Sequence, residues 1–270
     1  MNYFNQINNV VKNNSKIAYM HTIGCLFLAG VCMLGMMFDD RMLLDVSVWL
    51  KPLKFSLSAA IFIYTVGYYT NLYNYTKRKK NIINHVIAWT TLADILIIMT
   101  QGARGVKSHY NMDSLLDGLL FAAMGILVSF SVLVMLIFLV DTLRRKPKVN
   151  YSVFSALLIA WISTLYGSYV GGQMLGQQGH NVGVPDGGDG MFLVNWSLEG
   201  GDLRIAHFLG LHAIQVMPIA AFFIHKKMPN SPKLAGLLSV LFGISYLGII
   251  ALTFHQAKNG IPLVAMVLTT

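Results

Sequence analysis

Long apolar stretches alternate with short polar ones along the whole chain. A helix needs about 20 mainly apolar residues to cross the hydrocarbon core of a bilayer, and seven stretches reach that length. They are residues 17–38, 53–73, 82–101, 116–140, 152–172, 204–225 and 234–255. Because nearly all charged residues lie between these stretches, the pattern predicts an all-α fold, a polytopic membrane helical bundle of seven transmembrane helices.

The composition supports this prediction. Only 11% of the 270 residues are charged and 55% are hydrophobic, whereas soluble domains carry about 25% charged residues. So little charge cannot cover the surface of a small soluble domain. The composition therefore excludes a disordered chain, a coiled coil, a secreted disulfide scaffold and a soluble enzyme.

The distribution of charge predicts the orientation of the bundle. With the N-terminus in the cytoplasm, 13 of the 20 basic residues lie on that side and nine of the 11 acidic residues lie on the other. Basic residues concentrate in cytoplasmic loops, so we expect the N-terminus inside and the C-terminus outside. The net charge of +9 is then a topology signal. Contact of the basic loops with anionic lipid headgroups is expected, and nucleic-acid binding is not.

Three segments lie outside the predicted spans. Residues 1–16 form a polar cytoplasmic segment without the features of a cleavable signal peptide. The tail 256–270 ends in ten mainly apolar residues that reach only about 15 Å as a helix, so it is expected at the membrane interface or against the bundle. The connection 173–203 is 31 residues long and holds eight of the 24 glycines. We expect an ordered cap, with a flexible tether as the alternative, anchored on the bundle by Phe192, Leu193, Val194 and Trp196.

Five of the eight histidines map to the predicted outer half, namely His109, His180, His207, His212 and His255. Imidazoles are common ligands of transition metals and haem. His109, His207 and His255 have matching depth, and His180 lies in the glycine-rich loop. These four residues are therefore the predicted ligands of a haem or of a Zn, Cu or Fe ion that supports redox or hydrolytic chemistry.

Asp94 is the only acidic residue within a predicted span. A carboxylate inside a membrane is costly and marks function, with a partner to be identified. Asp94 lies about 10 Å deep and His212 about 12 Å deep, so we predict an Asp94–His212 pair that acts in proton transfer, substrate binding or orientation of a metal ligand. Gln101 shares a helix face with Asp94, and Gln215 shares one with His212. The alternative is a neutral Asp94 hydrogen-bonded to a neighbouring helix.

A cationic group follows the third span, where Arg104, Lys107 and His109 fall within six residues. On the sixth span Arg204 shares a face with His207. Such groups suit an anionic small molecule, a haem propionate or a lipid headgroup. The alternative for both arginines is a salt bridge, and the candidate acids are Asp113, Asp117, Asp186 and Asp202.

Other features have structural interpretations. The pairs Gly167/Gly171 and Gly172/Gly176 predict close helix packing, and Lys51 and Lys54 are expected to extend outward toward water. Cys25 and Cys32 lie about 10 Å apart along one helix, too far for a disulfide.

Four strings of the sequence resemble an uncharacterised family of bacterial multi-spanning integral membrane proteins. They are WLKPLKFS (49–56), RGVKSHYN (104–111), VGVPDGG (182–188) and GDLRIAHFLGLH (201–212). The resemblance implies a shared fold over most of the chain and a place in the bacterial inner membrane, without a transferable activity.

Three functions are consistent with the sequence. The first is a haem- or metal-dependent enzyme whose histidine-rich site faces the extracytoplasmic side. The second is a proton-linked transporter or channel that uses Asp94 and His212. The third is a membrane subunit without chemistry of its own.

Overall fold

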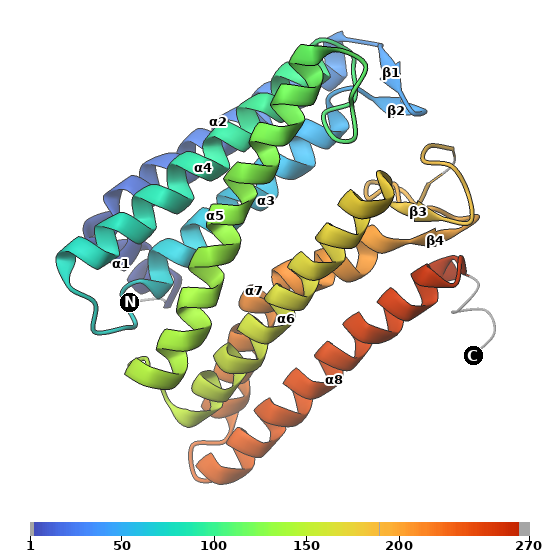
Figure 1. Cartoon of the computed structure of the whole chain (residues 1–270). Helices are drawn as coiled ribbons and strands as arrows, with labels where there is room; N and C mark the ends of the chain where they lie inside the picture. The colour runs from blue at the N-terminus through green and yellow to red at the C-terminus, as the bar shows by residue number, and fades with distance from the viewer. Residues whose placement is uncertain (1–2, 189, 265–270) are drawn as a thin grey trace. The chain divides into compact units, whose positions relative to one another are not determined.

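The computed structural model describes residues 3–188 and 190–264. The helices are α1 (Tyr3–Asn14), α2 (Lys16–Phe38), α3 (Leu50–Tyr69), α4 (Lys77–Ala103), α5 (Leu115–Arg145), α6 (Tyr151–Gln177), α7 (Leu203–Lys227) and α8 (Pro232–Lys258). The chain divides into two compact units at the middle of α5 (Figure 1). Unit 1 ends at Val134 and unit 2 begins at Met135.

Six helices of the described chain are long and apolar enough to cross a membrane, namely α2, α4, α5, α6, α7 and α8. The predicted all-helical, membrane-type fold is therefore confirmed. The predicted span 53–73 is a helix of 20 residues, α3, but it is not among the six. Lys51 and Lys54 in the first turns of α3, and Tyr68 and Tyr69 in the last, lower the mean hydropathy of this helix.

In unit 1, α2, α3 and α4 alternate in direction (Figure 1). A two-stranded antiparallel hairpin joins α2 to α3, with β1 (Met42–Leu43) paired to β2 (Val46–Ser47). Leu44 and Asp45 form its turn with φ angles of 52° and 63°, the backbone that short hairpin turns require. We call the end of unit 1 that carries this hairpin the hairpin end. The loop between α4 and α5 lies at the same end (Figure 1).

In unit 2, α6, α7 and α8 pack against one another, and the contact of α6 with α7 is the tightest described. A Cβ atom built on Gly167 would lie 2.8 Å from the Gly210 Cα. The close approach lets the Thr164 hydroxyl donate to the Gly210 carbonyl at 3.1 Å. The packing interpretation of Gly167 is confirmed. Gly172 and Gly176 face open space within the described residues, since no atom beyond their own helix backbone lies within 4 Å of a Cβ built on either.

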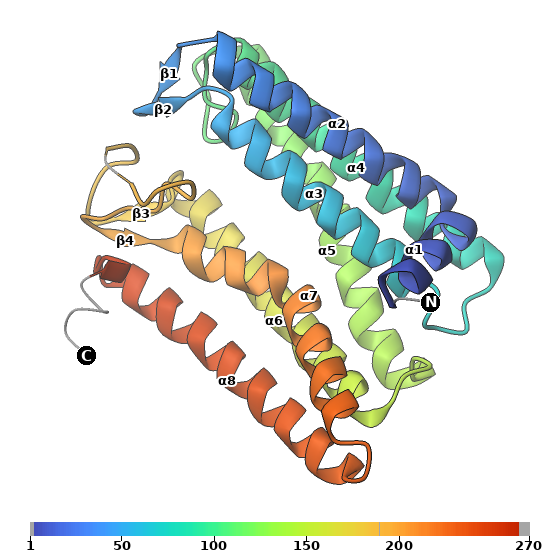
Figure 2. The same ribbon diagram turned by 180° about the vertical axis from the view of Figure 1, so that it is seen from behind.

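The described part of the long connection of unit 2 begins after α6 ends at Gln177 and is held at its base by a short sheet. β3 (Asn181–Val182) pairs antiparallel with β4 (Gly201–Asp202) and closes the loop at its base (Figure 2). A further bridge joins Gly190 to Ser197, and Gly201 packs directly on the Ala257 carbonyl of α8. Trp196 anchors the loop on Phe208 of α7 at 5.8 Å between ring centroids.

Two of the four expected loop anchors do not contact the bundle. Phe192 is 87% exposed and Leu193 is 64% exposed, because they occupy the tip of the loop. A left-handed φ of 65° at Leu193 turns the chain there.

The termini differ in part from expectation. Residues 1–16, predicted as a polar segment, contain α1, which the count of apolar residues alone did not indicate. Of the predicted tail 256–270, α8 continues to Lys258, and the Gln256 amide donates to the Ile261 carbonyl at 2.8 Å. Residues 265–270 of that tail lie outside the described residues.

Candidate functional site

A polar cluster at the hairpin end of unit 1 joins the end of α4 to the start of α5. Arg104 Nη1 lies 2.5 Å from Asp117 Oδ1, and the Gln101 side-chain amide donates to the same oxygen at 2.8 Å. The Ser114 hydroxyl donates to the other carboxylate oxygen at 2.6 Å. Gln101 is fully buried and Asp117 nearly so. The carboxylate is therefore well satisfied, and Arg104 makes the salt bridge that the alternative interpretation predicts.

A second ion pair ties the hairpin to the end of α4. Arg41 donates to both oxygens of Asp39, at 2.9 and 2.7 Å, and to the Ala103 carbonyl at 3.0 Å. The Trp49 indole donates to Asp39 at 2.8 Å. The hydrogen bonds from Arg41 and then from Trp49 hold the pKa of Asp39 well below its usual range. No spacing pattern in the sequence indicates this cluster, because it joins residues on both sides of the hairpin.

Lys51 and His109 meet at the hairpin end. Lys51, at the second position of α3, places Nζ 3.3 Å from His109 Nδ1, and the Ser108 hydroxyl lies 3.1 Å from the same nitrogen. An ammonium group only donates hydrogen bonds, so Nδ1 accepts and the neutral ring carries its hydrogen on Nε2. The ammonium group of Lys51, which the sequence predicts to extend outward, contacts this imidazole in the loop after α4.

Aromatic rings surround the His109 ring. The centroids lie at 5.8, 6.0 and 6.1 Å for Phe55, Tyr110 and Phe121. These three residues come from α3, from the α4–α5 loop and from α5. The rings fix the orientation of the imidazole and leave its polar edge toward Lys51 and Ser108.

Asp94 is partly buried on α4, two and a half turns below the end of that helix. Its carboxylate interacts electrostatically with Lys51. Within unit 1, Lys51 thus contacts the imidazole of His109 and lies within electrostatic range of the Asp94 carboxylate. The predicted pairing of Asp94 with His212 joins residues of different units and stays a prediction.

The three histidines of the unit 2 helices have separate environments. His207 Nδ1 lies 2.8 Å from the Gly167 carbonyl, and its ring packs where a Cβ on Gly171 would lie, 3.0 Å from Cε1. His212 hydrogen-bonds to the Gln215 side chain and packs on Phe208 with 4.4 Å between ring centroids. His255 is exposed near the end of α8.

His180 belongs to the base of the glycine-rich loop. Its Nδ1 lies 3.1 Å from Asp186 Oδ1 and 3.0 Å from Asn181 Oδ1, while the backbone N–H groups of His180 and Asn181 donate to the Asp186 carboxylate. Removal from water, followed by the nearby Arg204 charge, lowers the pKa of His180 despite the attraction of Asp186. His180 thus supports the loop as a neutral, hydrogen-bonded residue.

Arg204 also makes the salt bridge of the alternative interpretation. Its Nη2 lies 2.6 Å from Asp202 Oδ2 and donates to the Asn195 carbonyl at 2.5 Å. Asp202 is almost fully buried and accepts from the Ser197 N–H at 2.9 Å. This cluster connects the loop to the first turn of α7.

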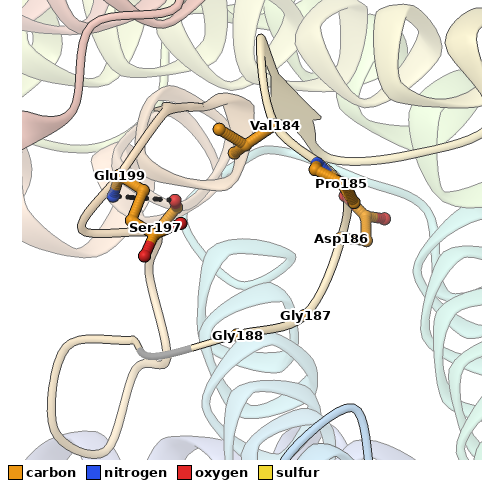
Figure 3. Close-up of a pocket in the computed structure, with 7 residues that line it drawn as sticks. All are labelled: Val184, Pro185, Asp186, Gly187, Gly188, Ser197 and Glu199. Carbon is orange, nitrogen blue, oxygen red and sulfur yellow. Dashed lines mark hydrogen bonds between the residues drawn. The ribbon is translucent and has the colours of Figure 1, made fainter.

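The loop encloses a half-open cavity of about 240 Å³. Figure 3 shows the segment around Pro185 on one side of it and the segment around Ser197 on the other. It is lined by Val184, Pro185, Asp186, Gly187, Gly188, Ser197 and Glu199.

Within residues 3–188 and 190–264 no group of three or more His, Cys, Asp or Glu side chains could hold a metal ion. The metal and haem prediction on His109, His180, His207 and His255 stays a prediction. Lys107, the remaining predicted anion-binding residue, is exposed, and its carbonyl accepts from Asn111 at 2.9 Å.

Sequence reasoning missed the role of Lys51. One signal was present, since Lys51 and Lys54 lie on the predicted outer side, where basic residues are scarce.

Comparison of the chain with protein-family models, with curated proteins and with solved structures gives no match in any of the three.

Proposed function

We propose that this chain is a seven-span integral membrane protein of the bacterial inner membrane that acts as a proton-linked transporter of a small anion. In this proposal α3 completes the bundle, the N-terminus is cytoplasmic and the hairpin end of unit 1 faces outward. The observation that carries the proposal is the 3.3 Å contact of Lys51 with His109 above the intramembrane carboxylate of Asp94. Ionisable residues inside a membrane commonly form proton relays.

The contact restricts the number of protons that the site can hold. The contact accommodates one charged group, an ammonium group on Lys51 beside a neutral His109 ring. A second proton would place two cations 3.3 Å apart, a repulsion of about 5 kcal/mol at an effective dielectric constant of about 20. Asp94 offsets part of this charge. A bound anion beside Lys51 and Ser108 would offset the rest, so anion binding and protonation favour each other and would be coupled.

Proton flux into proteoliposomes tests the proposal. The wild-type chain would be reconstituted with a trapped pH-sensitive dye, and an inward proton gradient would be imposed with and without lactate, succinate or phosphate. Flux above that of empty liposomes with at least one of these anions is expected. Asp94→Asn and Lys51→Gln should each abolish it, and the double variant should lose no more than either single variant.

Lys54→Gln is the matched control, because Lys54 lies one turn further along the same helix. It should retain the flux. Equal fluxes for Lys51→Gln and Lys54→Gln, or a wild-type flux equal to that of empty liposomes with all three anions, would contradict the proposal.

Metal or haem binding is the second candidate function. It is favoured by the hydrogen bond from His207 Nδ1 to the Gly167 carbonyl, since metal-bound histidines commonly donate their other ring N–H to a carbonyl. Elemental analysis and an absorbance spectrum of the purified protein test it. A haem absorbance band or stoichiometric Zn, Cu or Fe would support this candidate, and a protein with neither would exclude it.

A further inference from the structure

The end of unit 1 opposite the hairpin concentrates positive charge. Six basic residues lie there, namely Lys12, Lys16, Lys77, Arg78, Lys79 and Lys80, and we call them the basic end. The sequence has no acidic residue at positions 1–38 or 46–93. Four of the six occupy the first turn of α4, which contains no acidic residue. Because the N-terminal end of a helix is itself electropositive, this turn is complementary in charge to an anionic surface.

Helix α1 adds an apolar face to the basic end. Tyr3, Phe4, Ile7, Val10 and Val11 recur at the spacing that places residues on one side of a helix. Val11 is fully buried and lies close to Gly67 of α3. Toward its N-terminus the same face leaves the bundle, so that Tyr3 is 48% exposed and Phe4 is 67% exposed.

A buried polar network holds α1 and the basic turn together. Ser15, at the bend between α1 and α2, donates to the Gly67 carbonyl at 2.8 Å. Asn71, after α3, donates to the Ser15 hydroxyl at 3.0 Å and accepts from Lys80 of α4. The amphipathic helix and the basic turn are therefore parts of one surface (Figure 2).

We propose that α1 and the basic turn of α4 form a docking surface for the anionic headgroups of the adjacent membrane leaflet. Charge complementarity selects an anionic partner. The apolar face selects a lipid surface, since Tyr3 and Phe4 are exposed on it and Met20 of the following helix α2 is 64% exposed. Aromatic and aliphatic side chains of such a helix enter the headgroup and acyl boundary while the cations contact phosphates.

Site-specific quenching in the full chain tests the proposal. A fluorophore would be placed at Tyr3→Cys on the apolar face or at Asn9→Cys on the exposed polar face, with Cys25 and Cys32 shielded by burial. The chain would be reconstituted in phosphatidylcholine vesicles with or without phosphatidylglycerol. In the anionic vesicles an aqueous quencher should reach position 3 about fivefold less than position 9, since one Lys or Arg near such a surface changes binding by about that factor.

Variants that neutralise the basic turn of α4 form the second part of the experiment. The variant K77Q/R78Q/K79Q/K80Q should return position 3 to its accessibility in phosphatidylcholine, whereas R144Q/R145Q/K146Q, at the connection between α5 and α6, should not. High salt should weaken the protection in the unsubstituted chain, which keeps the test valid if the quadruple variant does not fold. Equal protection with and without anionic lipid, or no effect of salt, would overturn the proposal. Protection that rises with the protein-to-lipid ratio would assign the surface to a second copy and also overturn it.

Discussion

The glycine contact between α6 and α7 predicts a large effect of one methyl group. A Cβ at Gly210 would lie 2.5 Å from the Gly167 Cα, 2.9 Å from the Gly167 nitrogen and 3.0 Å from the Ser163 carbonyl oxygen. All three are backbone atoms that no side-chain rotation can move. Gly210→Ala therefore forces the two helices apart, and their separation stretches two interhelical hydrogen bonds, Thr164 to Gly210 and His207 to Gly167.

The expected magnitude follows from these contacts. Overpacking of a close contact costs about 1–3 kcal/mol, and each lost hydrogen bond costs about 1 kcal/mol. The higher helix propensity of alanine returns about 1 kcal/mol. Gly210→Ala should thus lower the free energy of unfolding by about 2–4 kcal/mol. Gly172→Ala is the matched control, because its Cβ would meet no described atom within 4 Å, and it should be neutral or slightly stabilising.

Unfolding of the full chain in mixed detergent micelles measures the difference. Trp161 is fully buried in unit 2 and stacks on Phe138 at 4.8 Å between ring centroids, so tryptophan fluorescence reports the transition. Equal stability of the Gly210→Ala and Gly172→Ala variants would refute the close-contact reasoning. A loss for both variants would show that any added methyl group on these helices is harmful.

Three further predictions concern the polar clusters. The guanidinium and indole donors that lower the pKa of Asp39 should stabilise the protein fully above about pH 4 and lose their effect as the pH falls toward the lowered pKa, so wild type and Asp39→Asn should converge in melting temperature in acid. The lowered pKa of His180 means that protonation below about pH 6.5 opposes folding. The hydrogen-exchange protection factors of residues 180–188 and 190–203 should therefore fall more between pH 7 and pH 5 in wild type than in His180→Gln. Asp117→Asn should lower the melting temperature by a few degrees, because it removes the charge partner of Arg104, whereas the exposed Asp113→Asn should not.

The spans could be predicted from the sequence because each depends on one continuous apolar run. The predicted range 116–140 lies inside α5, and 204–225 lies inside α7. The predicted number of seven transmembrane helices included α3. The lysines and tyrosines of α3 make it less apolar than the six other long helices. Helix α1 was missed because its five apolar residues are spaced along one face and do not form a run.

The candidate site was predictable only within single segments. Asp94 could be selected because it is the only acidic residue within a predicted span, and His109 because it belongs to the group of histidines predicted on the outer side. Their connection through Lys51 depends on how α3 lies against α4 and the following loop, which periodicity does not encode. For the same reason the salt bridge of Arg104 could be named only as one of several alternatives.

Because β3 pairs with β4, the positions of α6 and α7 do not depend on the length of the loop between the two strands. The chain enters and leaves the loop through the β3–β4 pair. Residues added between these strands therefore change the free energy of loop closure by only about 0.6 kcal/mol per doubling of loop length. An epitope inserted beside Phe192 and Leu193 should leave α6 and α7 in place, whereas one at Gly201 would displace Ala257. The fold thus has a segment that can be lengthened freely and a base that cannot.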